Sequence, residues 1–183
     1  MYIFIAGMAR SGKSAYAEYR LLELAELKAS ETGTPPTKIY VATAEVRADD
    51  AEMLARVEKH RLRRKGMGFT TIECCRDLGE LVLPEYACVL VESLSVWTAN
   101  EMFTASGVNH CAGEKVCADF LKIYGQVKDI VLVSDDVFSD GAEYDSLTEE
   151  YMRILGSLHV KLAALADEVI EVVSGLPVRY KPS

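Results

Sequence analysis

The chain has 183 residues, of which 50% are hydrophobic and 26% are charged, and its formal net charge is −8. This length and composition predict a single globular domain spanning residues 1–183, with a substantial buried core. The acidic balance argues against nucleic acid as a partner, and no apolar stretch reaches the ~20 residues that a membrane span requires.

The first predicted elements flank a glycine-rich motif. An apolar run at residues 3–6 predicts a buried strand, and residues 13–29 predict a helix. Between them the chain satisfies the P-loop pattern G-x-x-x-x-G-K-[ST] with Gly7, Met8, Ala9, Arg10, Ser11, Gly12, Lys13 and Ser14. In such a loop, backbone N–H groups point at phosphate oxygens, the lysine reaches the outer phosphates and the hydroxyl holds Mg²⁺. The motif therefore predicts a site for a nucleoside triphosphate with Mg²⁺.

Strands and helices alternate along the rest of the chain. Further strands are predicted at residues 38–43, 70–73, 88–92, 129–134 and 168–174, with an added edge strand at 177–181. Further helices are predicted at residues 49–65, 114–127 and 147–166. Continuous apolar strands separated by helices indicate a mostly parallel sheet that is covered on both faces. The predicted fold class is α/β, a three-layer sandwich like that of P-loop NTPases.

Polar residues gather at the carboxyl ends of these strands, where ligands bind in such sheets. These ends carry the P-loop, Thr43, Glu92, Asp135 and Asp136. A P-loop needs a metal-organising acid on a neighbouring strand, and the residues leave two candidates open, Glu92 or Asp135 with its neighbour. The segment 92–100 after the fourth strand is rich in hydroxyls. It is either a pocket wall or a helix start capped by Ser93 or Ser95.

One histidine stands out on the helix predicted at residues 49–65. His60 shares a face with Met53 and Val57, because the three are spaced i, i+4 and i+7. Basic residues surround it: Arg61, Arg63, Arg64 and Lys65. A structural role is the common one for a helical histidine; the alternative is a nucleophile that attacks phosphorus while arginines hold the phosphates. His110 and His159 have no such surroundings, and we interpret both as structural.

Several segments, in order, resemble the bifunctional adenosylcobinamide kinase / adenosylcobinamide-phosphate guanylyltransferase family of cobalamin assembly. The P-loop is similar to that family's G-G-A-R-S-G-K-S, and residues 40–43 to its Y-I-A-T strand. Residues 52–60 resemble its E-M-x-x-R-I-x-x-H helix, and residues 92–100 its [DE]-C-[LI]-T-x-W/M-x-[ST]-N segment. Residues 163–177 resemble its C-terminal part, so the resemblance spans the whole chain.

The resemblance implies two reactions. In the first, ATP or GTP gives its γ-phosphoryl group to a hydroxyl of adenosylcobinamide, with Lys13 as a catalytic residue. In the second, GTP guanylylates His60, and adenosylcobinamide phosphate then takes the GMP. It also favours Glu92, with Ser14, as the Mg²⁺ site, and we assign Thr43 and Arg61 to nucleotide binding.

The same resemblance implies a homotrimer. The sequence shows no secretory leader, and its five cysteines have no C-x-x-C spacing. We therefore expect reduced thiols in a cytoplasmic protein.

The chain departs from the family pattern at two places. Residues 134–138 read S-D-D-V-F where the family usually has T-N-E-V-G. In the family's F-R-D-x-x-G-x-x-N-Q helix, Met152 and Arg153 replace Arg-Asp, and His159 and Val160 replace Asn-Gln. These differences keep two other hypotheses open: a P-loop kinase of another small alcohol, with a structural His60, and a nucleotide-binding module that has lost one or both activities.

Overall fold

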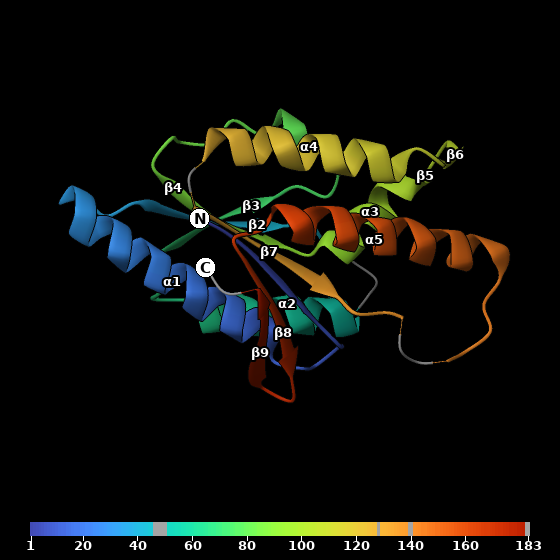
Figure 1. Ribbon diagram of the computed structural model, residues 1–183, viewed down its shortest axis with the longest axis horizontal. Helices are drawn as coiled ribbons and strands as arrows, with labels where there is room; N and C mark the ends of the chain where they lie inside the picture. The colour runs from blue at the N-terminus through green and yellow to red at the C-terminus, as the bar shows by residue number, and fades with distance from the viewer. Residues whose placement is uncertain (46–50, 128, 139–140, 182–183) are drawn as a thin grey trace.

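A seven-stranded sheet forms the centre of the protein, in a computed structural model that describes residues 1–45, 51–127, 129–138 and 141–181 (Figure 1). The strands lie in the order β3-β2-β4-β7-β1-β8-β9, and all pairs are parallel except β8 with β9. Their bounds are β1 Tyr2–Gly7, β2 Thr37–Ala42, β3 Phe69–Glu73, β4 Ala87–Glu92, β7 Asp129–Asp135, β8 Glu168–Val173 and β9 Leu176–Lys181. A separate two-stranded hairpin pairs β5 Phe103–Thr104 with β6 Gly107–Val108.

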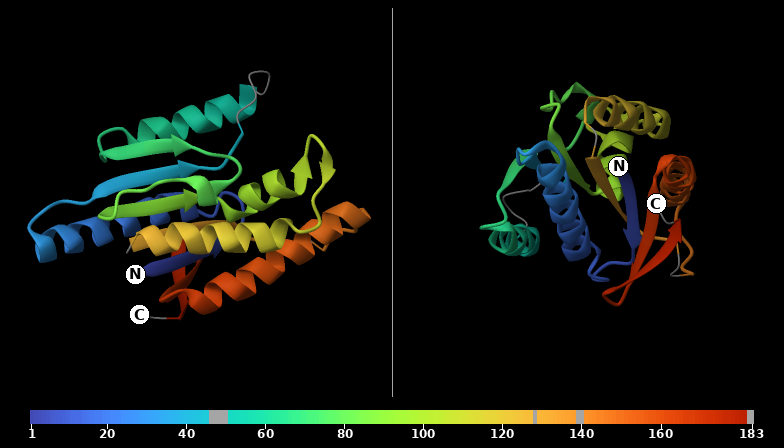
Figure 2. Two further views of the ribbon diagram at one scale, coloured as in Figure 1. Left: turned by 90° about the horizontal axis from the view of Figure 1, so that it is seen from above. Right: turned by 60° about the vertical axis from the view of Figure 1, so that its left-hand side comes forward.

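Helices cover both faces of the sheet. They are α1 Lys13–Thr32, α2 Ala51–Arg64, α3 Leu94–Met102, α4 Ala112–Gln126 and α5 Ser146–Leu165, with a short 3₁₀ turn at Leu78–Glu80. Helices α1 and α2 lie on one face, and α3, α4 and α5 on the other (Figures 1 and 2). This is the three-layer α/β sandwich that the alternation of strands and helices predicts.

The alternating directions of strand side chains build one core on each face. In β1, Tyr2 and Phe4 pack under α4 and α5, whereas Ile3 and Ile5 pack against α1. All four side chains are buried, and the central strands β4 and β7 are buried along nearly their whole length. Burial on both faces explains why these strands read as continuous apolar runs rather than alternating ones.

The predicted strands and helices are all present where the structure describes them; their ends coincide with the prediction or differ from it by up to three residues. The segment after β4 proves to be helix α3, whose N-cap is Ser93; the Ser93 hydroxyl accepts a hydrogen bond from the Val96 amide at 3.4 Å. The hairpin β5–β6 and the 3₁₀ turn were not predicted, because two- and three-residue elements have no detectable periodicity. Within the described residues, no helix is long and apolar enough to cross a membrane.

A partly buried ionic cluster joins α3 to α4. The Lys115 ammonium lies 2.8 Å from a carboxylate oxygen of each of Asp77, Glu101 and Asp119. The Glu101 and Asp119 side chains are only 4% and 8% exposed. Burial on its own raises the pKa of Asp119, but hydrogen bonds and charge from Lys115 and Lys122 outweigh it and hold that pKa below its usual value.

We expect Lys115→Met to lower the free energy of unfolding by about 2–3 kcal/mol at pH 7, because it leaves two buried carboxylates without their main counter-ion. The pKa of Asp119 is lower in the folded state than its usual value. Its ion pair with Lys115 therefore stabilises the folded state above the usual pKa, and this stabilisation is lost as pH falls through the folded-state pKa. The variant should therefore approach the wild type in stability below about pH 4. Urea unfolding across pH 3–7 measures this, with the exposed Lys122→Met as control; equal effects of both variants at pH 7 would contradict it.

Candidate functional site

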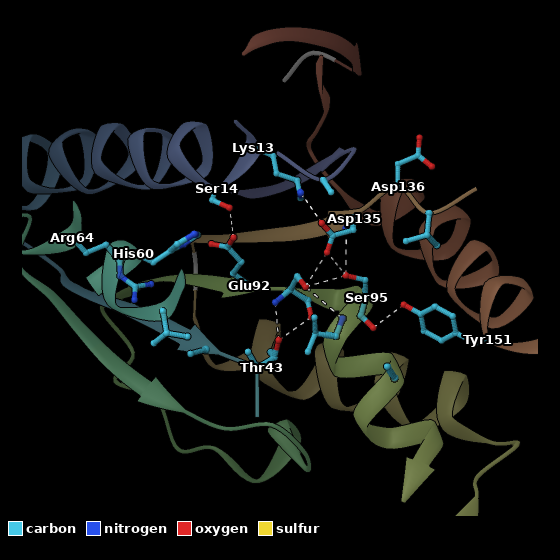
Figure 3. A pocket seen from close by; sticks show the side chains of 18 residues that line it. Lys13, Ser14, Thr43, His60, Arg64, Glu92, Ser95, Asp135, Asp136 and Tyr151 are labelled. Atoms are coloured by element: carbon cyan, nitrogen blue, oxygen red, sulfur yellow. Dashed lines mark hydrogen bonds and ion pairs between the residues drawn. The ribbon is translucent and has the colours of Figure 1, made fainter. Parts of the chain in front are cut away.

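A cavity of about 460 Å³ opens at the carboxyl ends of β1, β2, β4 and β7 (Figure 3). Its polar lining comes from the P-loop, from both candidate acids and from α2. The polar and charged lining residues are Lys13, Ser14, Thr43, His60, Arg64, Glu92, Ser93, Ser95, Asp135, Asp136 and Tyr151. The remaining lining residues are small or apolar: Ala9, Ala42, Ala44, Val57, Val96, Ala99 and Val137. Most of the polar residues predicted from the sequence thus meet in one place.

The P-loop wraps the N-terminus of α1, as the motif predicts. Gly12 adopts φ 95°, a left-handed conformation that suits glycine. A Cβ on Gly7 would lie 2.6 Å from the backbone oxygen of Val172, so this position has no room for a side chain. Both positions therefore favour glycine, in keeping with the tight curl that a P-loop needs to bind phosphate.

The two candidate acids both reach the P-loop, on different residues. The Ser14 hydroxyl donates a hydrogen bond to Glu92, and the Lys13 ammonium forms an ion pair with Asp135 at 2.6 Å. Lys13 also donates to the backbone oxygen of Met8 at 3.2 Å, and its side chain is only 6% exposed. Strand β7, which ends in Asp135, lies between β1 and β4, so the sheet order places the two carboxylates side by side.

Glu92 is held from a second direction. The Tyr40 hydroxyl donates to Oε2 of Glu92 at 3.0 Å, while Oε1 accepts from Ser14. Burial, and then the charge of Glu92, raise the pKa of Tyr40 well above its usual value, so this tyrosine stays protonated and remains a donor. The carboxylate is therefore oriented toward the P-loop serine.

Asp135 is fixed by the start of α3. Its Oδ2 accepts a hydrogen bond from the Ser95 hydroxyl at 2.6 Å and from the Ser93 hydroxyl at 3.4 Å. Tyr151, from α5, donates to the backbone oxygen of Ser95 at 3.0 Å. Burial, and then the charge of Asp135, raise the pKa of Tyr151 to about 12. Segment 92–100, for which the sequence left a pocket wall and a capped helix start as alternatives, is both.

Ser95 and Tyr151 were not predicted as site residues. Ser95 lies in the hydroxyl-rich segment 92–100, so its hydroxyl was a signal that could have identified it. Tyr151 lies in a region that departs from the family pattern, and nothing in the sequence pointed to it. Thr43 does line the cavity, but its hydroxyl is engaged by backbone atoms of Ser93, accepting from the nitrogen at 2.7 Å and donating to the oxygen at 3.0 Å. In this structure Thr43 therefore joins β2 to the start of α3.

The basic side chains near His60 point in different directions. His60 and Arg64 line the cavity, whereas Arg63 forms an ion pair with the buried Glu18 of α1 at 2.7 Å. Arg61, which we assign to nucleotide binding, lies outside the cavity, 57% exposed and 3.2 Å from Glu73. The helical phase explains this placement, because a residue next to His60 points about 100° away, while one at i+4 shares its face.

Along the predicted face of α2, Val57 and His60 both border the cavity, while the side chain of Met53 lies outside the described residues.

His159 packs behind the cavity rather than in it. Its Nε2 lies 2.7 Å from the Ser134 hydroxyl, and its ring meets those of Phe4 and Phe138 edge-on. Burial lowers the pKa of His159, against the opposing charges of Asp136 and Asp135, so the neutral form is favoured. His110 is exposed and lies 2.7 Å from Glu150.

The family model and the sequence relatives agree on one family. A family model described as cobinamide kinase / cobinamide phosphate guanyltransferase matches residues 3–180. The bifunctional adenosylcobalamin biosynthesis protein CobU of Salmonella typhimurium is 31% identical over 195 residues, covering 99% of this chain and 100% of that protein. The bifunctional adenosylcobalamin biosynthesis protein CobP of Pseudomonas aeruginosa is 32% identical over 181 residues, covering 97% and 95%. Among solved structures, the flagellar accessory protein FlaH of Methanocaldococcus jannaschii matches with a TM-score of 0.50 and 12% identity, covering 100% of this chain and 78% of that one, which supports the fold alone.

Proposed function

The chain belongs to the cobinamide kinase / cobinamide phosphate guanyltransferase family. We propose that the cavity at the P-loop carries out both reactions of this family. The protein is a bifunctional transferase of cobalamin biosynthesis. The observation that supports the assignment of both reactions to this cavity is that a P-loop lysine and a histidine on a separate helix line the same space.

For the kinase reaction, we propose that the P-loop binds ATP or GTP with its γ-phosphate beside Lys13. The terminal hydroxyl of adenosylcobinamide attacks the γ-phosphorus, the P–O bond to the β-phosphate breaks, and the hydroxyl proton leaves to solvent or to a nearby carboxylate. Lys13 neutralises charge that develops on the transferring group.

The oxygen donors at the head of the cavity fit Mg²⁺. The Ser14 hydroxyl and the Glu92 carboxylate touch each other beside the P-loop, and Mg²⁺ takes such hard oxygen ligands together with phosphate oxygens. We propose that these two residues hold the ion. When bound, Mg²⁺ neutralises phosphate charge in both reactions.

For the guanylyl transfer, we propose that a ring nitrogen of His60 attacks the α-phosphorus of GTP. A P–N bond forms, the bond to the β-phosphate oxygen breaks, pyrophosphate leaves, and the ring loses its proton. A phosphate oxygen of adenosylcobinamide phosphate then attacks the same phosphorus, the P–N bond breaks, and the imidazole is regenerated. The covalent intermediate divides one transfer into two displacements.

The Lys13–Asp135 ion pair competes with the nucleotide, since a phosphate must replace the carboxylate at the ammonium. We expect Asp135→Asn to tighten binding of an uncleavable α,β-methylene analogue of GTP about fivefold, the worth of an ion pair of about 1 kcal/mol. Calorimetric titration measures the change. Asp135→Glu retains the charge and is expected to show no gain, so an equal gain in both variants would contradict this account.

The direct test of the proposed function is to incubate the protein with adenosylcobinamide, ATP, GTP and Mg²⁺ and to analyse the products by mass spectrometry. Adenosylcobinamide phosphate and adenosylcobinamide-GDP are both expected. Phosphorylation without GDP product would reduce the protein to a kinase. If the folded protein phosphorylates other small alcohols but not adenosylcobinamide, the substrate proposal fails.

We infer a homotrimer from the family resemblance, and a cytoplasmic location from the free cysteines. Strand β9 offers a contact surface for the oligomer, because Leu176, Val178 and Tyr180 are all exposed on this outer strand of the sheet. Apolar residues in a row on such a strand are typical of contact surfaces between chains.

A further inference from the structure

Arg64 is a buried cation whose hydrogen-bonding capacity is not fully used. The residue is only 7% exposed, and its guanidinium carbon lies 3.4 Å from the centroid of the Tyr40 ring. Within the described part of the chain, its buried Nη1 atom has no hydrogen-bond partner. A buried donor on a charged group is costly to leave unpaired, so such an atom calls for an acceptor that the described residues do not supply.

Tyr40 links Arg64 to Glu92. The Tyr40 hydroxyl donates to Glu92, which also accepts from Ser14, and the Arg64 guanidinium stacks on the ring of the same tyrosine. Stacking also holds the guanidinium in one plane and so limits the freedom it would lose on binding a ligand. The end of α2 is anchored as well, through the bidentate hydrogen bonds from Arg63 to Glu18 at 2.7 and 2.8 Å.

Arg64 and His60 lie one helical turn apart on α2 and line the same cavity. Figure 3 shows the two side chains next to each other, on the side of the cavity that carries Ser14 and Glu92. A phosphate group whose phosphorus is attacked by His60 would therefore lie within reach of the Arg64 guanidinium.

We propose that Arg64 is a further catalytic residue of guanylyl transfer, and that Nη1 binds a non-bridging oxygen of the phosphate that His60 attacks. The inference rests on the proposed function, because it assumes nucleotide transfer to His60. In that step the P–N bond forms while the bond to pyrophosphate breaks, and negative charge builds up on the non-bridging oxygens. A rigid guanidinium stabilises this charge more than it stabilises bound GTP, so it accelerates the step. The γ-phosphoryl transfer takes place at another phosphorus and does not need this contact.

The test measures the rate at which GTP and Mg²⁺ add GMP to the protein, by intact mass spectrometry of quenched samples. We expect Arg64→Met to slow labelling about 10²-fold, with ATP-dependent phosphorylation of adenosylcobinamide changed less than about threefold. Lys65→Gln removes a neighbouring exposed cation and serves as the matched control, with labelling unchanged. Arg64→Lys keeps the charge without the planar fork and is expected to slow labelling about tenfold; it decides the matter if the methionine variant fails to fold.

Two results would overturn the inference. One is labelling of Arg64→Met at the wild-type rate. The other is an equal loss of both activities, because Arg64 would then act only through Tyr40 and Glu92, which serve both reactions. If wild-type protein itself takes up no GMP, the proposed guanylyl transfer fails, and the role of Arg64 falls with it.

Discussion

Replacing Lys13 by methionine is expected to lower both kinase and guanylyl-transfer rates by about 10²–10³-fold. Its ammonium lies at the N-terminus of α1 and lines the cavity. There it forms an ion pair with Asp135, at the position where we expect it to bind a phosphate group of the nucleotide. Both reactions build charge on phosphate oxygens bound by this loop, so both lose the same stabilising group. Because the effect reaches two chemically different steps, it identifies a shared nucleotide site rather than two separate ones.

Initial rates of adenosylcobinamide phosphorylation and of GMP labelling, measured on the same preparation, check this expectation. Lys161→Met, on the exposed side of α5, removes the same charge outside the cavity and should change neither rate. Thermal unfolding of each variant controls for folding. A Lys13 variant that loses only one of the two activities would show that the reactions use different nucleotide sites.

Replacing His60 by asparagine is expected to remove the covalent nucleotide and to reduce formation of adenosylcobinamide-GDP by at least about 10³-fold, since the step loses its nucleophile. Phosphorylation of adenosylcobinamide should persist within about threefold, because Lys13, Ser14 and Glu92 remain in place. This selective loss separates the histidine from the P-loop chemistry.

His110→Asn is the matched control, because His110 is exposed and lies beside Glu150, outside the cavity. It should behave as wild type in both assays. If the His60 variant still forms adenosylcobinamide-GDP at the wild-type rate, the covalent route is wrong. If it loses both activities while remaining folded, the histidine serves the nucleotide site as a whole.

Much of the fold followed from local patterns. Strands β4 and β7 were predictable because they are buried on both faces and therefore continuously apolar. The P-loop was predictable because its chemistry depends on backbone curvature and on two adjacent side chains, all within eight residues of sequence. By contrast, the two-residue strands β5 and β6 are set by the contacts of their own turn.

The arrangement of the site was less predictable because it depends on sheet order. Nothing in the sequence fixes which strand lies between β1 and β4, so the residues alone left both Glu92 and Asp135 as candidates, and only the family resemblance favoured Glu92. The structure places both carboxylates at the P-loop, Glu92 on Ser14 and Asp135 on Lys13. The choice between neighbouring arginines was a matter of helical phase. The spacing of His60 and Arg64 places them on one face of the helix, whereas Arg61, which we assigned to nucleotide binding, lies off that face.

The measurement that tests the central claim most directly is the mass of the wild-type protein after incubation with GTP and Mg²⁺, followed by peptide mapping at neutral pH. The account predicts a mass increase of one GMP, lost on brief acid treatment as expected for a P–N bond, with the nucleotide on the peptide that contains His60. Folded protein that gains no mass, or that carries the nucleotide on a different residue, would contradict it.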